Sequence, residues 1–236
     1  MSMVLTAIII GTAFLGLYWA LYGQRRYNDM FVPKRKTKLK AVLFDLDGVL
    51  IDSFERQNTV FNDLRVKFGL KEIGEKEFRE KLWGNSLEVN AKKYFGEYDL
   101  KELHTAYDNL VKKHVGKSKL IDRAKDVLET IKKKKIKIGL ATNTTAERAA
   151  NDLGFHKIKH YFDAIITADD VEKPKPYPDL IIKLCETLNV MPDETIFIGD
   201  TKNDYKAGKA AGSFVVGINT TGGLVIDKLS DMLDLV

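Results

Sequence analysis

Short runs of apolar residues alternate along the chain with longer stretches whose apolar positions recur every three or four residues. A run that is apolar at consecutive positions is typical of a strand buried on both faces. Five runs fit this description: Ala41–Phe44, Ile136–Ala141, Ala164–Thr167, Thr195–Ile198 and Phe214–Ile218. The alternation of such strands with helices predicts an α/β protein with a doubly wound parallel sheet.

Amphipathic helices are expected between these strands. Their apolar stripes are clearest in Ala124-Val127-Leu128-Ile131 and in Leu180-Ile181-Leu184-Leu188. Side chains at these spacings lie on one face of a helix, which can then pack on the sheet. The soluble part of the chain is also long enough to bury a core and to carry a second, smaller domain.

The interval between the first two strands is too long for a single crossover connection. Four helical patterns fill it, at Glu55–Phe68, Glu75–Trp83, Leu87–Phe95 and Leu100–Val115. We therefore expect an inserted helical cap at residues 53–119. The catalytic core would consist of residues 40–52 and 120–236.

Polar residues follow three of the expected strands directly. Asp45 and Asp47 come after the first, Thr142 and Asn143 after the second, and Gly199-Asp200 after the fourth, with Asp204 four residues further on. Since the carboxyl ends of parallel strands meet at one edge of a sheet, these side chains should converge there. Asp45 and Asp47 could then reach one metal ion and one substrate. A proline-stiffened loop, Glu172–Pro176, contributes Lys173 and Lys175.

The order of these residues resembles the haloacid dehalogenase superfamily in its phosphatase branch. The family pattern is Asp-x-Asp, then Ser or Thr, then Lys, then Gly-Asp-x-x-x-Asp. The resemblance runs from about Lys40 to near the C-terminus. It implies that Asp45 is the nucleophile and forms an aspartyl-phosphate. It also implies that Asp47 is a general acid for the leaving oxygen and then a general base for water, a role worth ~10²–10⁴ in rate.

The same resemblance implies a Mg²⁺ cofactor. Its ligands would be the carboxylates of Asp45 and Asp200 and the backbone carbonyl of Asp47, with Asp204 acting from behind them. Three acids around one point require cations, because like charges disfavour ionisation. Thr142 is expected to hold phosphate oxygens, with Asn143 beside it as a further substrate contact.

The lysine of the pattern is expected to be Lys173, by its position within the motif, and it would also hold phosphate oxygens. Lys175 is the competing candidate. On this interpretation Lys175 is a solvated loop charge.

A cap inserted after the first motif closes over small substrates in this family, so a small phosphorylated metabolite is expected. The segment Trp83-Gly84-Asn85-Ser86 separates two cap helices. We expect Gly84, Asn85 and Ser86 to contact the substrate, or to form a plain turn with Trp83 in the core of the cap. Three other cap residues could contact anions or simply be solvated: Arg56, Gln57 and Arg79.

The first residues of the chain suggest a membrane anchor. Residues 4–22 are uncharged, and at 1.5 Å per residue they span roughly 28 Å, close to the ~30 Å of a bilayer's hydrocarbon core. Residues 23–39 would be a basic juxtamembrane linker in contact with anionic lipid, with the catalytic domain on the cytoplasmic side. The alternatives are a core helix, or a true start at Met30 and a cytoplasmic protein.

Charge is concentrated in that linker region. The chain carries a net charge of +5, but residues 25–40 hold seven basic residues and one acid, which leaves residues 41–236 slightly acidic. This distribution argues against a nucleic-acid partner. The single cysteine, Cys185, excludes an intramolecular disulfide.

The expected function is a Mg²⁺-dependent phosphatase acting on a small phosphate monoester, with a phosphoglycolate-like substrate as the nearest guess. Pyrophosphatase activity is an alternative that needs the same site. A sugar-phosphate mutase is another, although such mutases usually carry a histidine at the position of Gln57. Dehalogenases lack the second acid, which is present here as Asp47. A membrane-anchored interaction module without activity is the alternative from another class.

Overall fold

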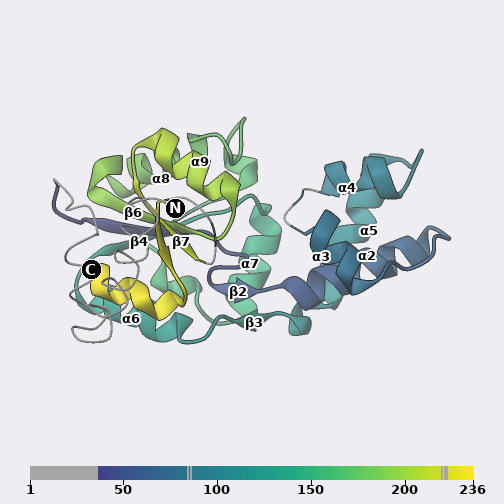
Figure 1. Cartoon of the computed structure of the whole chain (residues 1–236), viewed down its shortest axis with the longest axis horizontal. Helices are drawn as coiled ribbons and strands as arrows, with labels where there is room; N and C mark the ends of the chain where they lie inside the picture. The colour runs from purple at the N-terminus through teal and green to yellow at the C-terminus, as the bar shows by residue number, and fades with distance from the viewer. Residues whose placement is uncertain (1–36, 84, 86, 219, 221–222) are drawn as a thin grey trace, which may run out of the picture. The chain divides into compact units, whose positions relative to one another are not determined.

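The computed structural model describes residues 37–83, 85, 87–218, 220 and 223–236 (Figure 1). They belong to one compact unit, Thr37–Val236. The expected anchor at residues 4–22 and most of the expected linker therefore lie outside the described residues. No helix in the described part is long and apolar enough to cross a membrane. This finding contradicts the membrane localisation expected from the sequence, and nothing in the described residues supports the expected lipid contact.

A six-stranded parallel sheet in the order β5-β4-β1-β6-β7-β8 forms the centre of the protein. Its strands are β1 (Ala41–Phe44), β4 (Lys137–Ala141), β5 (Ala164–Ile166), β6 (Thr195–Gly199), β7 (Phe214–Ile218) and β8 (Leu224–Ile226). β1 lies in the middle, where Ala41 is paired with Lys137 on one side and with Thr195 on the other. The predicted doubly wound α/β fold is confirmed, and β8 is an edge strand that the sequence pattern did not indicate.

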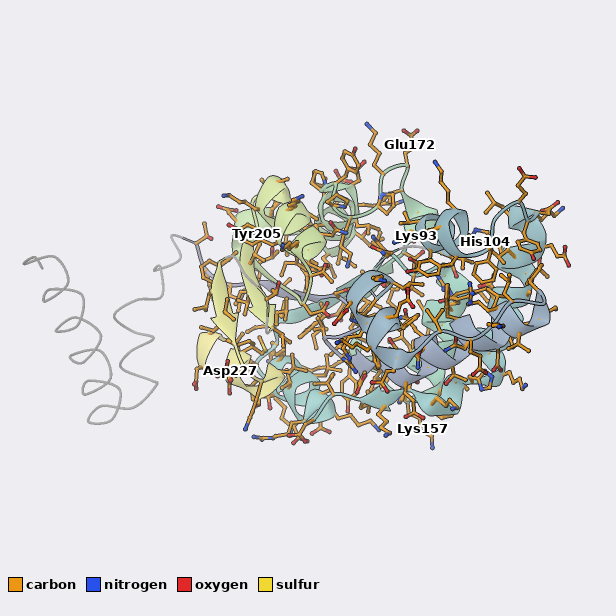
Figure 2. All side chains as sticks on the ribbon, turned by 45° about the vertical axis from the view of Figure 1, so that its right-hand side comes forward. Lys93, His104, Lys157, Glu172, Tyr205 and Asp227 are labelled. Atoms are coloured by element: carbon orange, nitrogen blue, oxygen red, sulfur yellow. The ribbon has the colours of Figure 1, made fainter. Side chains whose placement is uncertain are left out.

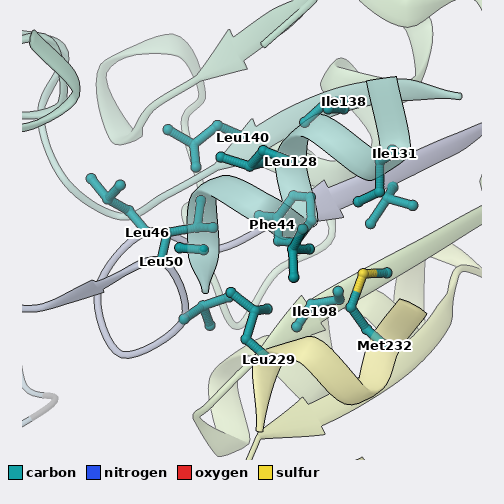
Figure 3. Close-up of a cluster of buried hydrophobic side chains, with 14 of the residues drawn as sticks. Phe44, Leu46, Leu50, Leu128, Ile131, Ile138, Leu140, Ile198, Leu229 and Met232 are labelled. Atoms are coloured by element: carbon teal, nitrogen blue, oxygen red, sulfur yellow. The ribbon is translucent and has the colours of Figure 1, made fainter. Parts of the chain in front are cut away.

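Helices cover both faces of this sheet. α6 (Ala124–Lys133), α7 (Ala146–Phe155) and the 3₁₀ helix η5 (Leu229–Leu235) share one apolar core with Val42 and Phe44. Figure 3 shows Phe44 of this core together with Leu128 of α6 and Met232 of η5. α8 (Asp179–Leu188) and α9 (Lys202–Ala211) share the other with Ala41 and Leu43. Successive residues of β1 thus point to opposite faces, and all four are fully buried. Short 3₁₀ turns complete the connections: η2 (Lys159–Tyr161), η3 (Ala168–Asp170) and η4 (Pro192–Glu194).

The long interval after β1 forms a helical cap. The chain leaves the core through β2 (Ile51–Asp52) and returns through the 3₁₀ turn η1 (Val115–Lys117) and β3 (Lys119–Leu120). β2 and β3 pair antiparallel, with Ile51 opposite Leu120. Between them lie α2 (Phe54–Lys67), α3 (Glu75–Lys81), α4 (Leu87–Tyr94) and α5 (Leu100–Lys113). The domain boundaries at residues 53 and 119 stay a prediction.

The cap has an apolar core of its own, rich in aromatic rings. Phe61 packs in tilted or edge-on geometry against Phe78 and Phe95, with ring centroids 5.6 and 5.4 Å apart. Such ring pairs stabilise a core beyond the area they bury. These ring contacts help to hold the cap helices together.

Candidate active site

Three strand ends bring polar side chains to one edge of the sheet. The hydrogen bonds of the sheet extend past the ends of the strands, from Asp45 N–H to the carbonyl of Ile198 (2.9 Å) and from Thr142 N–H to that of Ile166 (3.1 Å). The first residues beyond β1, β4 and β6 are Asp45, Thr142 and Asp200. All three line one cavity, as the strand-end argument predicts.

Three carboxylates form a tight cluster in this cavity. Asp45, Asp200 and Asp204 each offer an oxygen atom, and these atoms lie within 4.8 Å of one another. Two glycines make room for the cluster. A Cβ on Gly48, whose φ is +78°, would lie 2.0 Å from Asp200 Oδ2, and a Cβ on Gly199 would lie 2.2 Å from Asp204 Cβ. Larger residues at either position would displace a carboxylate.

Asp204 is fixed by a capping box at the start of α9. Its carboxylate accepts hydrogen bonds from the backbone N–H of Thr201 (2.9 Å) and from the Thr201 hydroxyl, and the hydroxyl in turn accepts from Asp204 N–H (3.2 Å). This reciprocal arrangement is a local property of the first turn of a helix. It holds the buried carboxylate of Asp204 behind Asp200 and Asp45.

The cluster needs positive charge. Burial raises the pKa of Asp45 well above its ordinary value, and the carboxylates of Asp204 and Asp200 raise it further against the opposing effect of Lys175. Burial and then Asp204 raise the pKa of Asp200 to about 7. Asp200 Oδ1 is buried without a hydrogen-bond partner among the described residues. A hard divalent cation with oxygen ligands, such as Mg²⁺, fits this donor set.

The structure corrects the expected choice between the two lysines. Lys175 is 5% exposed, and its Nζ lies 2.7 Å from both Asp45 Oδ1 and Asp204 Oδ1. Lys173 is exposed and lies over the ring of Tyr177, 5.5 Å from its centroid. Burial alone would lower the pKa of Lys175, but Asp204 and Asp45 outweigh it and raise the pKa above its ordinary value. Lys175 is therefore the cation of the cluster.

Asn143 explains why Lys175 faces inward. Its side-chain amide exchanges two hydrogen bonds with the backbone of Lys175, to the carbonyl and from the N–H, both at 2.9 Å. The Lys175 ammonium also donates to the carbonyl of Ala141 at the end of β4 (3.1 Å). Asn143, expected to contact substrate, thus has its amide committed to the lysine loop. The neighbouring Glu172 points outward (Figure 2).

Asp47 is held by hydroxyl groups that the sequence reasoning missed. One carboxylate oxygen accepts from the Ser53 hydroxyl, and the other accepts from Thr144 Oγ1 at 3.2 Å. Ser53 and Thr144 lie close to the Asp-x-Asp and Thr-Asn motifs in the sequence, and this closeness is the signal by which they could have been predicted. Thr142 is almost fully buried and lines the cavity, where its hydroxyl accepts from Thr144 N–H (3.1 Å).

Arg56 is neither a solvated charge nor an anion contact in this structure. Its guanidinium makes a bidentate pair with Asp152 on α7 and lies 3.6 Å from Asp47 Oδ1. Arg79 packs over the ring of Phe54, 3.6 Å from its centroid, and does not line the cavity. Gln57 does line the cavity and donates to Ser53 Oγ (3.2 Å).

The cap forms the other wall of the cavity, which has a volume of about 530 Å³. The lining residues from the cap are Gln57, Trp83, Asn85, Leu87, Glu88, His104, Tyr107 and Asp108. Asn85 is thus at the expected place, while Gly84 and Ser86 lie outside the described residues. Trp83 lines the cavity and also packs on Phe54 in the cap, with ring centroids 5.0 Å apart. The substrate contact expected of this segment stays a prediction. His104 is on the cap helix α5 (Figure 2).

Arg148 joins the two walls. It lies in the first turn of α7 and lines the cavity, with its guanidinium 5.3 Å from the ring centroid of Tyr107 and Nε 3.9 Å from Asp108 Oδ1, both on the cap helix α5. A guanidinium at this place can bind a carboxylate or phosphate on the leaving side of a substrate.

The fold and the motifs agree with comparisons to known proteins. A family model described as haloacid dehalogenase-like hydrolase matches residues 42–218. A pyrophosphatase PpaX from Bacillus mycoides is 29% identical over 222 residues, covering 84% of this chain and 97% of the relative. The solved structure of a candidate phosphoglycolate phosphatase from Lactobacillus plantarum has a TM-score of 0.76 at 21% identity, covering 85% of this chain and 100% of the other. That of β-phosphoglucomutase from Clostridium difficile has a TM-score of 0.69 at 26% identity, covering 82% and 93%.

The chain belongs to the haloacid dehalogenase-like hydrolases. The resemblance to the phosphatase branch of this family, drawn from the four motifs, is confirmed, and the protein is a hydrolase acting on phosphate esters.

Proposed function

We propose that the protein is a Mg²⁺-dependent phosphatase that hydrolyses a small phosphate monoester through an aspartyl-phosphate. The observation that supports this most strongly is the convergence of Asp45, Asp47, Asp200 and Lys175 on one cavity. A nucleophile, an acid/base group, a metal-binding carboxylate and a fixed cation are the parts that phosphoryl transfer requires.

Each of these residues has a definite task in the proposed reaction. A carboxylate oxygen of Asp45 attacks phosphorus and forms the acyl-phosphate bond, while the bond from phosphorus to the leaving oxygen breaks and Asp47 gives that oxygen a proton. Asp47 then takes a proton from water, whose oxygen attacks phosphorus and releases inorganic phosphate and the free Asp45. Lys175 and the hydroxyl of Thr142 stabilise the phosphoryl oxygens. Asp45 and Asp200, with Asp204 behind them, would hold Mg²⁺, which neutralises phosphate charge when bound.

The cavity favours a small substrate. Its volume of about 530 Å³ and its cap wall suit a metabolite and not a macromolecule. Arg148 supplies one cation to the part of the cavity that faces the cap, where the acids Glu88 and Asp108 also line the cavity. A leaving group with one negative charge, as in 2-phosphoglycolate, fits this balance better than a polyanion does.

Pyrophosphate hydrolysis is the second candidate, because a pyrophosphatase PpaX is 29% identical to this chain over 222 residues. The same carboxylates and lysine would serve it. A sugar-phosphate mutase is supported by the structural likeness to β-phosphoglucomutase, but Gln57 cannot serve as an acid or base.

The test is phosphate release by the full-length protein with Mg²⁺ on a fixed panel: 2-phosphoglycolate, glycerol 3-phosphate, β-glucose 1-phosphate, inorganic pyrophosphate and p-nitrophenyl phosphate. Turnover that requires Mg²⁺ and is lost in Asp45→Asn supports the phosphatase, and the order of kcat/KM names the substrate class. Conversion of β-glucose 1-phosphate to an isomer without phosphate release would favour the mutase. A folded protein that hydrolyses none of these compounds would refute the proposal.

A further inference from the structure

Asp47 is contacted by residues of both the cap and the core. Ser53 and Arg56, at the start of the cap helix α2, approach one carboxylate oxygen, and Thr144, just before the core helix α7, donates to the other. The orientation of Asp47 therefore depends on how α2 lies against α7.

A buried ion pair fixes α2 against α7. Arg56 is 3% exposed and Asp152 is 1% exposed, and the guanidinium bonds both carboxylate oxygens of Asp152, with Nη2 3.0 Å from Oδ2. The pair joins two residues 96 positions apart in the sequence, one in the cap and one in the core. A buried bidentate pair of this kind is geometrically specific, since the planar fork fits one orientation of the carboxylate.

The helix α7 also contacts the second connection between cap and core. His156 lies one turn after Asp152, and its Nε2 is 2.9 Å from Ser118 Oγ, just before β3. Since the Ser118 hydroxyl gives its proton to the carbonyl of Val115 (2.7 Å), it accepts from His156 Nε2–H. Asp152 and His156 thus attach α7 to both segments through which the chain enters and leaves the cap.

We propose that the buried pair of Arg56 and Asp152 is a positioning device, which holds the acid/base carboxylate of Asp47 in its working orientation and ties that orientation to the cap. This inference rests on the proposed phosphatase function. Arg56 and Asp152 are positioning residues, because neither lines the cavity.

The pair also keeps Arg56 from binding Asp47 more closely. Arg56 Nη2 is 3.0 Å from Asp152 and 3.6 Å from Asp47, so Asp152 is its closer partner. Without the charge of Asp152, the guanidinium is left with Asp47 as its neighbouring carboxylate. Asp47 is then drawn into a closer ion pair with Arg56 and is displaced from the leaving oxygen.

The choice of leaving group separates this role from a purely structural one. An alkyl leaving oxygen needs a proton from Asp47, whereas p-nitrophenolate leaves without one. kcat/KM reports the first chemical step and not the later hydrolysis of the acyl-phosphate. In Asp152→Asn we expect kcat/KM to fall ~10²-fold with the best alkyl phosphate of the panel and by less than about threefold with p-nitrophenyl phosphate.

Two further variants complete the design. Glu147→Gln breaks another ion pair between α7 and the cap, Glu147 with Lys112 at 2.5 Å, which touches neither Asp47 nor the cavity, and it should leave both rates unchanged. The double variant Arg56→Gln/Asp152→Asn removes both buried charges, so it avoids the lone buried charge that destabilises a single variant. It should show the same selective loss with alkyl phosphates, at least ~10-fold.

Equal losses with both leaving groups in the folded variants, or no loss with either, would overturn the positioning role. These outcomes differ from failure of the phosphatase itself, in which the wild-type protein hydrolyses neither compound and both proposals fall.

Discussion

At the scale of single residues, the position of one ammonium group decides the chemistry of the cluster. Lys175→Met should lower kcat/KM ~10²–10³-fold, because the side chain that offsets Asp45 and Asp204 is lost. Lys173→Met is the matched control in the same loop, and it should stay within about threefold of wild type, since its side chain is exposed and does not line the cavity. A larger effect at Lys173 than at Lys175 would contradict the structure.

The raised pKa of Asp200 predicts a pH effect on the metal-free protein. Its folded-state pKa is about 7, above the ordinary value near 4. The folded state therefore binds the proton more tightly, and the stability from this group is present at pH 4 and is lost as pH rises through 7. In EDTA, Asp200→Asn should thus become more stable than wild type, by up to a few kcal/mol, as pH increases across this range. Urea unfolding of both proteins at pH 4.5, 6 and 8 measures the difference in their free energies of unfolding. A difference that does not grow with pH would contradict the raised pKa of Asp200.

At the scale of elements, two helical glycines in different surroundings give opposite predictions. A Cβ on Gly208 in α9 would lie 2.6 Å from Val215 Cγ2 and 2.9 Å from Phe197 Cδ1, whereas a Cβ on Gly154 in α7 would meet nothing within 4 Å. Gly208→Ala should therefore cost about 1–3 kcal/mol through overpacking. Gly154→Ala should add roughly 0.5–1 kcal/mol through reduced backbone freedom in the unfolded chain. Thermal unfolding of the two variants measures the shift of each melting temperature from wild type. Shifts in the same direction for both variants would refute the packing argument.

The elements themselves were largely predictable from the sequence. Four of the five expected strands are buried over most of their length, so each has consecutive apolar residues, and the helices of the cap carry apolar positions at helical spacing. β8 (Leu224–Ile226) was missed; at this edge of the sheet Leu224 is only partly buried and Val225 is exposed. The strand-end carboxylates were predictable for a simple reason, since a parallel sheet places them together whatever the details of packing.

The contacts made across the sequence were not predictable. Lys175 faces inward because of Asn143, 32 residues away, and Arg56 is buried because of Asp152, 96 residues away. Spacing within a motif carries no information on which of two loop lysines turns toward the core. A charged residue on a helix is usually solvated, so burial of Arg56 becomes visible only with its partner in place.

At the scale of the whole molecule, the carboxylate cluster predicts that Mg²⁺ stabilises the fold. A cation that binds only the folded state adds about 2.7 kcal/mol at a hundredfold excess over its Kd. The melting temperature should therefore rise with Mg²⁺ and fall back to its metal-free value when EDTA is added. Asp200→Asn should abolish most of this rise. Asp169→Asn is the control, because Asp169 lines the same cavity but is not in the cluster. An equal rise in wild type and Asp200→Asn would place the cation elsewhere.

The central place of β1 has a consequence for how the protein is made. This strand leaves the ribosome first among the described strands, yet its partners β4 and β6 begin only at Lys137 and Thr195. At 5–20 residues per second, β1 waits roughly 8–30 s for its second neighbour. The cap, whose helices contact one another over short sequence distances, can fold during that time. The nascent chain thus carries an unpaired, fully apolar strand behind a finished helical domain, a state in which chaperones would be expected to bind it.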